Sequence, residues 1–125
     1  MSRRQRILIV DDDPDLRRLL TLSLERLGGM EASALPGGEA LVEEAATGSW
    51  DAVLLDVMMP GLDGPTCLER LRADPRTHEV PVVFLTAKGD ELELRRLEEL
   101  SGLPSLRKPF DPIALPDQLR AILDR

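Results

Sequence analysis

Charged and hydroxyl side chains stand at the ends of short apolar runs in this sequence. They are Asp11, Asp12 and Asp13 after the first run, Asp56 at the end of the third, Thr86 at the end of the fourth and Lys108 at the end of the fifth. If these runs are parallel strands, their carboxyl ends meet at one edge of a sheet, which is where open α/β proteins bind ligands. We therefore expect carboxylates, a hydroxyl and an ammonium group to meet in one site.

The expected site combines groups that suit a divalent cation and a phosphoryl group. Carboxylates within a few ångströms repel one another and raise each other's pKa, unless a cation that prefers oxygen ligands offsets the repulsion. Mg²⁺ fits best, because it binds one or two protein carboxylates together with a phosphate oxygen. A carboxylate can also attack phosphorus to form an acyl phosphate. Lys108 and Thr86 would then neutralise and hydrogen bond the transferred oxygens.

Each of these residues also has a structural interpretation when it is taken alone. Asp13 precedes Pro14, which is typical of a residue that caps a helix, and we assign it that role. A single aspartate after a strand is most often a turn former or a helix cap. Taken alone, Thr86 is an end-of-strand hydroxyl and Lys108 is a solvated charge. Complementary groups from four separate segments favour a functional site over coincidence.

Three conspicuous residues fall outside the expected site. His78 lies in a polar connection between Pro75 and Pro81, where a surface loop is expected. Trp50 precedes the third run, at the end opposite Asp56, and is expected to pack rather than to react. Cys67 is the only cysteine, which excludes an intrachain disulfide and a cysteine-based zinc site, and we expect it to pack on a helix.

The elements that must position the site alternate between strand and helix from end to end. Apolar runs predict strands at residues 7–10, 30–35, 52–55 and 82–86, with a weaker strand at 105–108. The first helix is marked by Leu16, Leu19, Leu20, Leu24 and Leu27 at helical spacing, followed by Gly28 as a stop. Further helices are expected at about residues 38–47, 65–73, 90–100 and 116–123. This alternation is typical of a parallel sheet with crossover helices.

The polarity of the runs predicts their order in the sheet. The first, third and fourth runs are continuously apolar and suit central strands, whereas the second and fifth contain polar residues and suit edges. The fold class is therefore α/β, a flavodoxin-like (βα)5 three-layer sandwich with strand order 2-1-3-4-5. In the helix at 90–100, Leu94, Leu97 and Leu100 share one stripe, and Leu92 falls outside it and is expected to be exposed.

Length and composition narrow the classes of function. The 125 residues suit one domain over 1–125, and no apolar segment is long enough to cross a membrane or to serve as a signal peptide, so we expect a cytoplasmic chain. The net charge of −7 argues against direct binding to nucleic acid, which requires clustered Lys and Arg. A membrane or nucleic acid is therefore not an expected partner.

With these residues in place, the sequence resembles the receiver domain of two-component response regulators from about Arg6 to its end. The matching segments are ILIVDDDPDLRRLL, LLDVMMPGLDG, VPVVFLTAK and RKPFDP, in the order and spacing of that family. The resemblance implies that Asp56 is the phosphoacceptor and that Thr86 and Lys108 contact the phosphoryl group. It implies a Mg²⁺ cofactor held by Asp12 directly, by Asp11 largely through water, by Asp56 and by the Met58 carbonyl. It also implies a cis peptide between Lys108 and Pro109.

The resemblance also implies a role in signalling. Asp56 would take its phosphoryl group from the phosphohistidine of a sensor histidine kinase or phosphotransfer protein, in a Mg²⁺-dependent reaction that switches contacts with a downstream protein or effector domain. A phosphorylation-dependent dimer is a further expectation. The chain would not be an enzyme in the ordinary sense, since it would catalyse only its own phosphorylation and dephosphorylation.

Two other functions fit parts of the pattern. A phosphorylation-independent interaction module with the same fold is one alternative, but such a module is expected to have lost one or more of the site residues. A haloacid dehalogenase-type phosphatase also uses an aspartyl nucleophile and Mg²⁺, but it needs a second aspartate two positions after the first, where this chain has Met58.

One position departs from the family pattern. Receivers often have an aromatic residue three positions before the lysine, and here that position is Ser105. Because a serine lacks the area of a buried ring, we expect any change on phosphorylation to travel through residues 87–90 and the start of the following helix.

Overall fold

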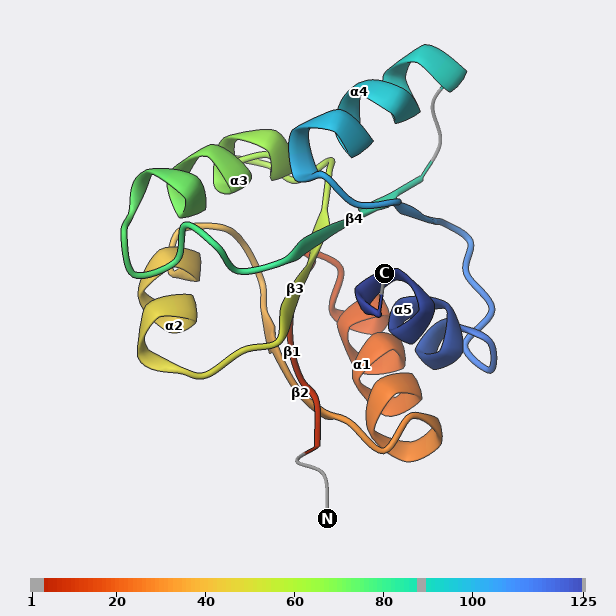
Figure 1. Ribbon diagram of the computed structural model, residues 1–125. Coiled ribbons are helices and arrows are strands. Elements are labelled where there is room, and N and C mark those ends of the chain that lie inside the picture. The colour runs from red at the N-terminus through yellow and green to blue at the C-terminus, as the bar shows by residue number, and fades with distance from the viewer. Residues whose placement is uncertain (1–3, 88–89, 125) are drawn as a thin grey trace.

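Five parallel strands form the centre of the chain in the computed structural model, which describes residues 4–87 and 90–124 (Figure 1). The strands are β1 (Arg6–Val10), β2 (Glu31–Leu35), β3 (Ala52–Asp56), β4 (Val82–Thr86) and β5 (Leu106–Arg107). They lie in the order β2-β1-β3-β4-β5, and each neighbouring pair is parallel. The predicted parallel sheet and its strand order are therefore confirmed.

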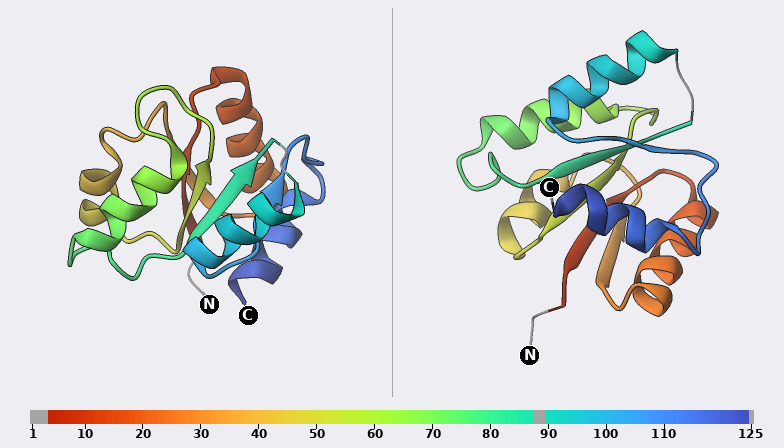
Figure 2. Two further views of the ribbon diagram at one scale, coloured as in Figure 1. Left: turned by 90° about the horizontal axis from the view of Figure 1, so that it is seen from above. Right: turned by 45° about the vertical axis from the view of Figure 1, so that its right-hand side comes forward.

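Helices cover both faces of this sheet (Figures 1 and 2). On one face lie α1 (Pro14–Leu22), its continuation η1 (Ser23–Leu27) and α5 (Leu115–Leu123). On the other lie α2 (Leu41–Thr47), α3 (Gly64–Ala73) and α4 (Glu91–Ser101). The predicted three-layer sandwich is confirmed, and none of the helices in the described ranges has the length and apolar character needed to cross a membrane.

The sheet divides the hydrophobic core into two clusters, because successive side chains of a strand point to opposite faces. On β1, Leu8 and Val10 pack toward α2, α3 and α4, and Ile7 and Ile9 pack toward α1 and α5. Every residue of β3 and β4 is buried, whereas β2 has no buried residue. This pattern agrees with the prediction that continuous apolar runs are central and that β2 is an edge.

The first helix does not end as the regular helix that its leucine spacing predicts. It passes into a π-helical turn, η1, in which the Gly28 N–H donates to the Ser23 carbonyl at 3.1 Å. The buried Ser23 hydroxyl donates to the Pro112 carbonyl, which lies between β5 and α5. This contact ties the end of the first helix to the segment that follows Lys108.

Two other elements are shorter than expected. The second helix begins at Leu41 rather than near residue 38. At Gly38 the chain passes against α3, where a Cβ would lie 2.2 Å from Cys67 Sγ. The fifth strand spans two residues, Leu106 and Arg107, which lie opposite Leu85 and Thr86 of β4. The remaining strand and helix bounds agree with the predicted ones to within one residue.

The exposed leucines of α4 were only partly predicted. Leu92 is 64% exposed, as expected, and Leu97 is buried in the core. Leu100, which shares the stripe of Leu97, is 55% exposed, so the stripe is buried only in part. Leu100 lines an open pocket of about 530 Å³ between α4 and the β3–α3 connection.

The Ser23–Pro112 hydrogen bond gives a test of how the first helix is held. Replacing Ser23 by alanine leaves the Pro112 carbonyl without this donor, which should lower the free energy of unfolding by about 1 kcal/mol and the melting temperature by about 3 to 6 °C. Thermal unfolding followed by circular dichroism measures the effect. Ser33→Ala, on the exposed edge strand, is the control, and an equal loss in both variants would contradict the assigned role of Ser23.

Candidate functional site

The carboxyl ends of four strands meet at one edge of the sheet and bring the predicted site residues together. Asp11 and Asp12 follow β1, Asp56 ends β3, Thr86 ends β4 and Lys108 follows β5. Because β3 lies between β1 and β4 in the sheet, Asp56 has the other groups on either side of it. The expected juxtaposition is therefore present in the structure.

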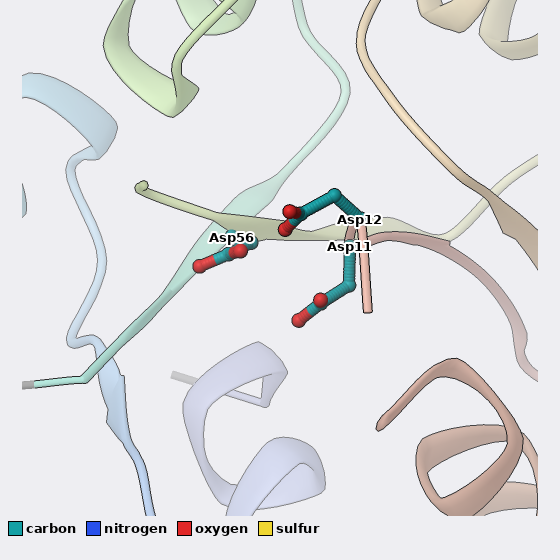
Figure 3. A group of neighbouring side chains, drawn as sticks. All are labelled: Asp11, Asp12 and Asp56. Carbon is teal, nitrogen blue, oxygen red and sulfur yellow. The ribbon is translucent and has the colours of Figure 1, made fainter. Parts of the chain in front are cut away.

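Three carboxyl groups form the acidic part of the site (Figure 3). Asp11, Asp12 and Asp56 each offer an oxygen, and these oxygens all lie within 4.8 Å of one another. Asp11 is fully buried and Asp56 is 3% exposed, whereas Asp12 is exposed at the rim. Oxygen ligands at this separation, with one of them open to solvent, fit a hard divalent cation such as Mg²⁺.

Lys108 supplies the positive charge of the site. Its Nζ lies 3.1 Å from Asp11 Oδ2 and 3.1 Å from Asp56 Oδ1, and its side chain is largely buried. The Lys108 N–H donates to the Thr86 carbonyl at 2.8 Å, which extends the β4–β5 pairing by one bond and fixes where the lysine leaves the sheet. The peptide between Lys108 and Pro109 is cis, as the family resemblance implies.

The electrostatics of the pair follow from burial and neighbouring charges. Burial raises the pKa of Asp56, and the charge of Asp11 raises it further, whereas Lys108 and the backbone N–H of Met58 lower it by hydrogen bonding; the net pKa is raised. Burial lowers the pKa of Lys108, but hydrogen bonds and charges from Asp11 and Asp56 outweigh this effect and raise it overall. The lysine is therefore charged at neutral pH, and Asp56 ionises at a cost.

Thr86 completes the set of predicted groups. It ends β4, the strand beside β3, and is 4% exposed. In the register of that pair, Asp56 lies opposite Leu85, so Thr86 stands one residue beyond Asp56 along the sheet edge. Residues 88 and 89, part of the loop in which we expected the response to phosphorylation, lie outside the described residues.

The loop between β1 and α1 is ordered by its own aspartates. Asp13 caps α1 by accepting hydrogen bonds from the N–H groups of Asp15 and Leu16, which confirms the role predicted for it. Asp11 Oδ1 accepts the Asp13 N–H at 2.9 Å. In addition, Arg17 Nη1 donates to the Asp11 carbonyl at 2.8 Å, a contact that the sequence reasoning did not identify.

The residues that were set aside lie outside the site. His78 is exposed and its ring nitrogen pairs with the Pro75 carbonyl. Trp50 precedes β3, donates to the Glu44 carbonyl and lies under the Arg6 guanidinium, 4.5 Å from the ring centre. Cys67 is buried in α3. All three predictions are confirmed.

Ser105 occupies a half-buried position directly before β5. Its N–H donates to Glu98 Oε2 at 2.7 Å, which joins this residue to α4. Within the described part of the chain, its buried hydroxyl has no hydrogen-bond partner. The connection between α4 and β5 is thus held by a carboxylate–backbone contact, where the family pattern has an aromatic side chain.

The raised pKa of Asp56 predicts how stability depends on pH. The folded chain binds this proton more tightly than the unfolded chain, so the stability that Asp56 provides in its neutral form is lost as pH rises from its ordinary value of 3.8 through the raised value. Asp56→Asn should therefore melt at a higher temperature than the wild type at pH 7 without a divalent cation, and this advantage should disappear near pH 3.

The control for this measurement is Asp124→Asn, which removes an exposed carboxylate near the C-terminus. It should have nearly the same melting temperature as the wild type at both pH values. If Asp56→Asn melted below the wild type at pH 7, the balance of burial and ion pairing described for Asp56 would be wrong.

One known protein family matches this chain. A family model for the response regulator receiver domain matches residues 7–120 of the chain. The chain is 41% identical over 120 residues to the transcriptional activator protein IrlR of Burkholderia pseudomallei (strain 1026b), and 42% identical over 120 residues to the transcriptional regulatory protein CpxR of Escherichia coli (strain K12). These alignments cover 96% of this chain but 51% and 50% of the relatives, so the chain spans about half of their length.

Solved structures agree with these sequence matches. A sensor protein from Polaromonas sp. JS666 superposes with a TM-score of 0.85 at 34% identity, over 98% of each chain. The N-terminal domain of a response regulator receiver protein from Methanoculleus marisnigri JR1 superposes with a TM-score of 0.76 at 34% identity, over 96% of this chain and 97% of that one. The similarity thus extends over nearly the whole fold.

Proposed function

Because this chain belongs to the response regulator receiver domain family, we propose that it accepts a phosphoryl group on Asp56 in a two-component phosphorelay. The observation that carries the proposal is the buried Asp56 carboxylate, with Lys108 Nζ 3.1 Å from one of its oxygens and two further aspartates beside it. The chain is a signalling domain rather than a classical enzyme. Its chemistry is limited to its own phosphorylation and dephosphorylation.

In the proposed reaction, an Asp56 oxygen attacks the phosphorus of a phosphohistidine. The new O–P bond forms as the N–P bond breaks, and the histidine ring leaves with the electron pair of that bond and takes up a proton. Lys108, which already pairs with Asp56, then pairs with one of the incoming phosphoryl oxygens, and the Thr86 hydroxyl hydrogen bonds to another phosphoryl oxygen. Both residues therefore act on charge that appears as the phosphoryl group arrives.

We assign the cation site to Asp11, Asp12 and Asp56, together with the Met58 carbonyl. The three carboxylates support this assignment by their separation, and the backbone of Met58 lies next to Asp56, since its N–H hydrogen bonds to the carboxyl group. Mg²⁺ bound here would neutralise negative charge on the phosphoryl oxygens. Asp11 is fully buried and its carboxylate already pairs with Lys108, so we assign it a contact with the cation through water. We assign the direct contact to Asp12.

The proposed partner is a sensor histidine kinase or a phosphotransfer protein, which must bring its phosphohistidine to Asp56. A mostly apolar pocket of about 350 Å³ borders the site, lined by Leu16, Leu19, Ala87, Lys108, Pro109 and Phe110. A partner seated there would place its phosphoryl group at the sheet edge. Downstream, we propose that the phosphorylated domain acts on an effector domain or protein, with phosphorylation-dependent dimerisation as one route.

The relatives named transcriptional regulators are about twice as long as this chain, and their names are compatible with such an effector. That this chain itself does not contact nucleic acid remains a prediction from its net charge of −7.

Intact mass spectrometry tests the phosphoacceptor directly. Incubation with acetyl phosphate and Mg²⁺ should add one phosphoryl group to the wild type and none to Asp56→Asn, because the amide cannot act as the nucleophile. Asp15→Asn, which changes an exposed carboxylate outside the trio, should be labelled like the wild type. Labelling of Asp56→Asn to the wild-type extent would reject Asp56, and an unlabelled wild type would favour the phosphorylation-independent module.

Thermal unfolding tests the cation site independently of phosphorylation. Mg²⁺ should raise the melting temperature of the wild type, because it relieves repulsion among three carboxylates and binds only the native state. The rise should be much smaller in Asp12→Ala and unchanged in Asp15→Ala. An equal rise in Asp12→Ala and the wild type would count against Asp12 as a ligand.

A further inference from the structure

Of the groups in the proposed cation site, the Asp12 carboxylate is the one held least firmly in place by its neighbours. It is exposed, and among residues 4–87 and 90–124 no group hydrogen bonds to it. A free aspartate side chain samples several rotamers, and ordering it on a cation costs conformational entropy. The direction of this carboxylate must therefore be restricted by the backbone that carries it.

Both peptide planes that flank Asp12 are held by charged side chains. The plane before it contains the Asp11 carbonyl, which accepts Arg17 Nη1 at 2.8 Å. The plane after it contains the Asp13 N–H, which donates to Asp11 Oδ1 at 2.9 Å. Since peptides are planar, orienting these two units sets both backbone dihedrals of Asp12 and hence the direction of its Cα–Cβ bond.

Arg17 is itself fixed by the first helix. Its N–H donates to the Asp13 carbonyl at 2.9 Å in the first turn of α1, and its side chain is half-buried. The fully buried Leu20, one turn further on, anchors the helix on the sheet. The guanidinium thus connects the acidic loop to a rigid element of the fold.

We propose that Arg17 is a positioning residue of the cation site, which fixes the Asp12 carboxylate by holding the Asp11 carbonyl. The inference rests on the proposed function of the three carboxylates. Charge alone predicts the reverse effect, because a guanidinium beside the site repels a divalent cation. A positioning role and a purely electrostatic one therefore predict opposite changes in cation affinity when Arg17 is replaced.

The test measures the affinity of the chain for Mn²⁺, by electron paramagnetic resonance of the free ion. Arg17→Met removes the donor and the charge but keeps an unbranched apolar stem, so packing along α1 is preserved. Its dissociation constant should be about tenfold higher than that of the wild type, as for other residues that orient metal ligands. Arg17→Lys retains a donor for the single carbonyl contact and should recover most of the affinity.

Arg18→Met is the matched control, because Arg18 is the next residue of α1, is exposed and makes no hydrogen bond in the described part of the chain. It removes the same charge and should bind Mn²⁺ with an affinity within about twofold of the wild type. If Arg17→Met bound Mn²⁺ as tightly as Arg18→Met or more tightly, the proposal would be overturned.

Two further outcomes are informative. Circular dichroism without a cation should give Arg17→Met and Arg18→Met similar melting temperatures, and unfolding of Arg17→Met alone would make Arg17 a residue of helix stability and overturn the positioning role. A wild-type chain that binds no Mn²⁺ would overturn the proposed cation site and this inference together, which separates that failure from a failure of Arg17 alone.

Discussion

The site depends on one interaction, the ammonium of Lys108 between the buried carboxylates of Asp11 and Asp56. Two like charges removed from water are tolerated only when an opposite charge contacts them. Asp11 follows β1 and Asp56 ends β3, which is the neighbouring strand, whereas the lysine follows β5. The sheet order places β5 beyond β4, so a long side chain is needed to span the width of the site. The ends of β1, β3 and β5 hold the three groups of this contact in position.

The net charge of the site indicates which ligand would balance it. Lys108 offsets one of the three carboxylates, so two negative charges remain among Asp11, Asp12 and Asp56 when all are ionised. A single divalent cation matches that remainder, and a bound phosphoryl group would shift the balance again toward negative charge. Binding of the cation and of the phosphoryl group are therefore expected to assist one another, since each offsets the charge that the other leaves.

Most of the fold could be predicted from the sequence because its strongest signals are local. Continuous apolar runs identify central strands, and residues at their carboxyl ends share one edge whatever the details of the helices. The failures concern contacts between distant segments. At the π turn the Ser23 hydroxyl bonds to the Pro112 carbonyl, and before α2 the chain at Gly38 passes against Cys67 of α3. The contact of Arg17 with a backbone carbonyl is invisible to sequence reasoning, because only the folded loop presents that acceptor to the helix.

The shortness of β5 has a mechanical consequence. Asp11 and Asp56 extend from five-residue strands that have partners on both sides, whereas Lys108 follows a strand of two residues that pairs with β4 alone. Fewer ladder hydrogen bonds resist displacement of the lysine than of either carboxylate. The backbone that carries the two carboxylates is therefore held more rigidly than the backbone that carries the lysine. When the charge on Asp56 changes, Lys108 can move with it at a low cost in deformation energy. The Ser105–Glu98 hydrogen bond links the segment that leads into β5 and Lys108 to α4.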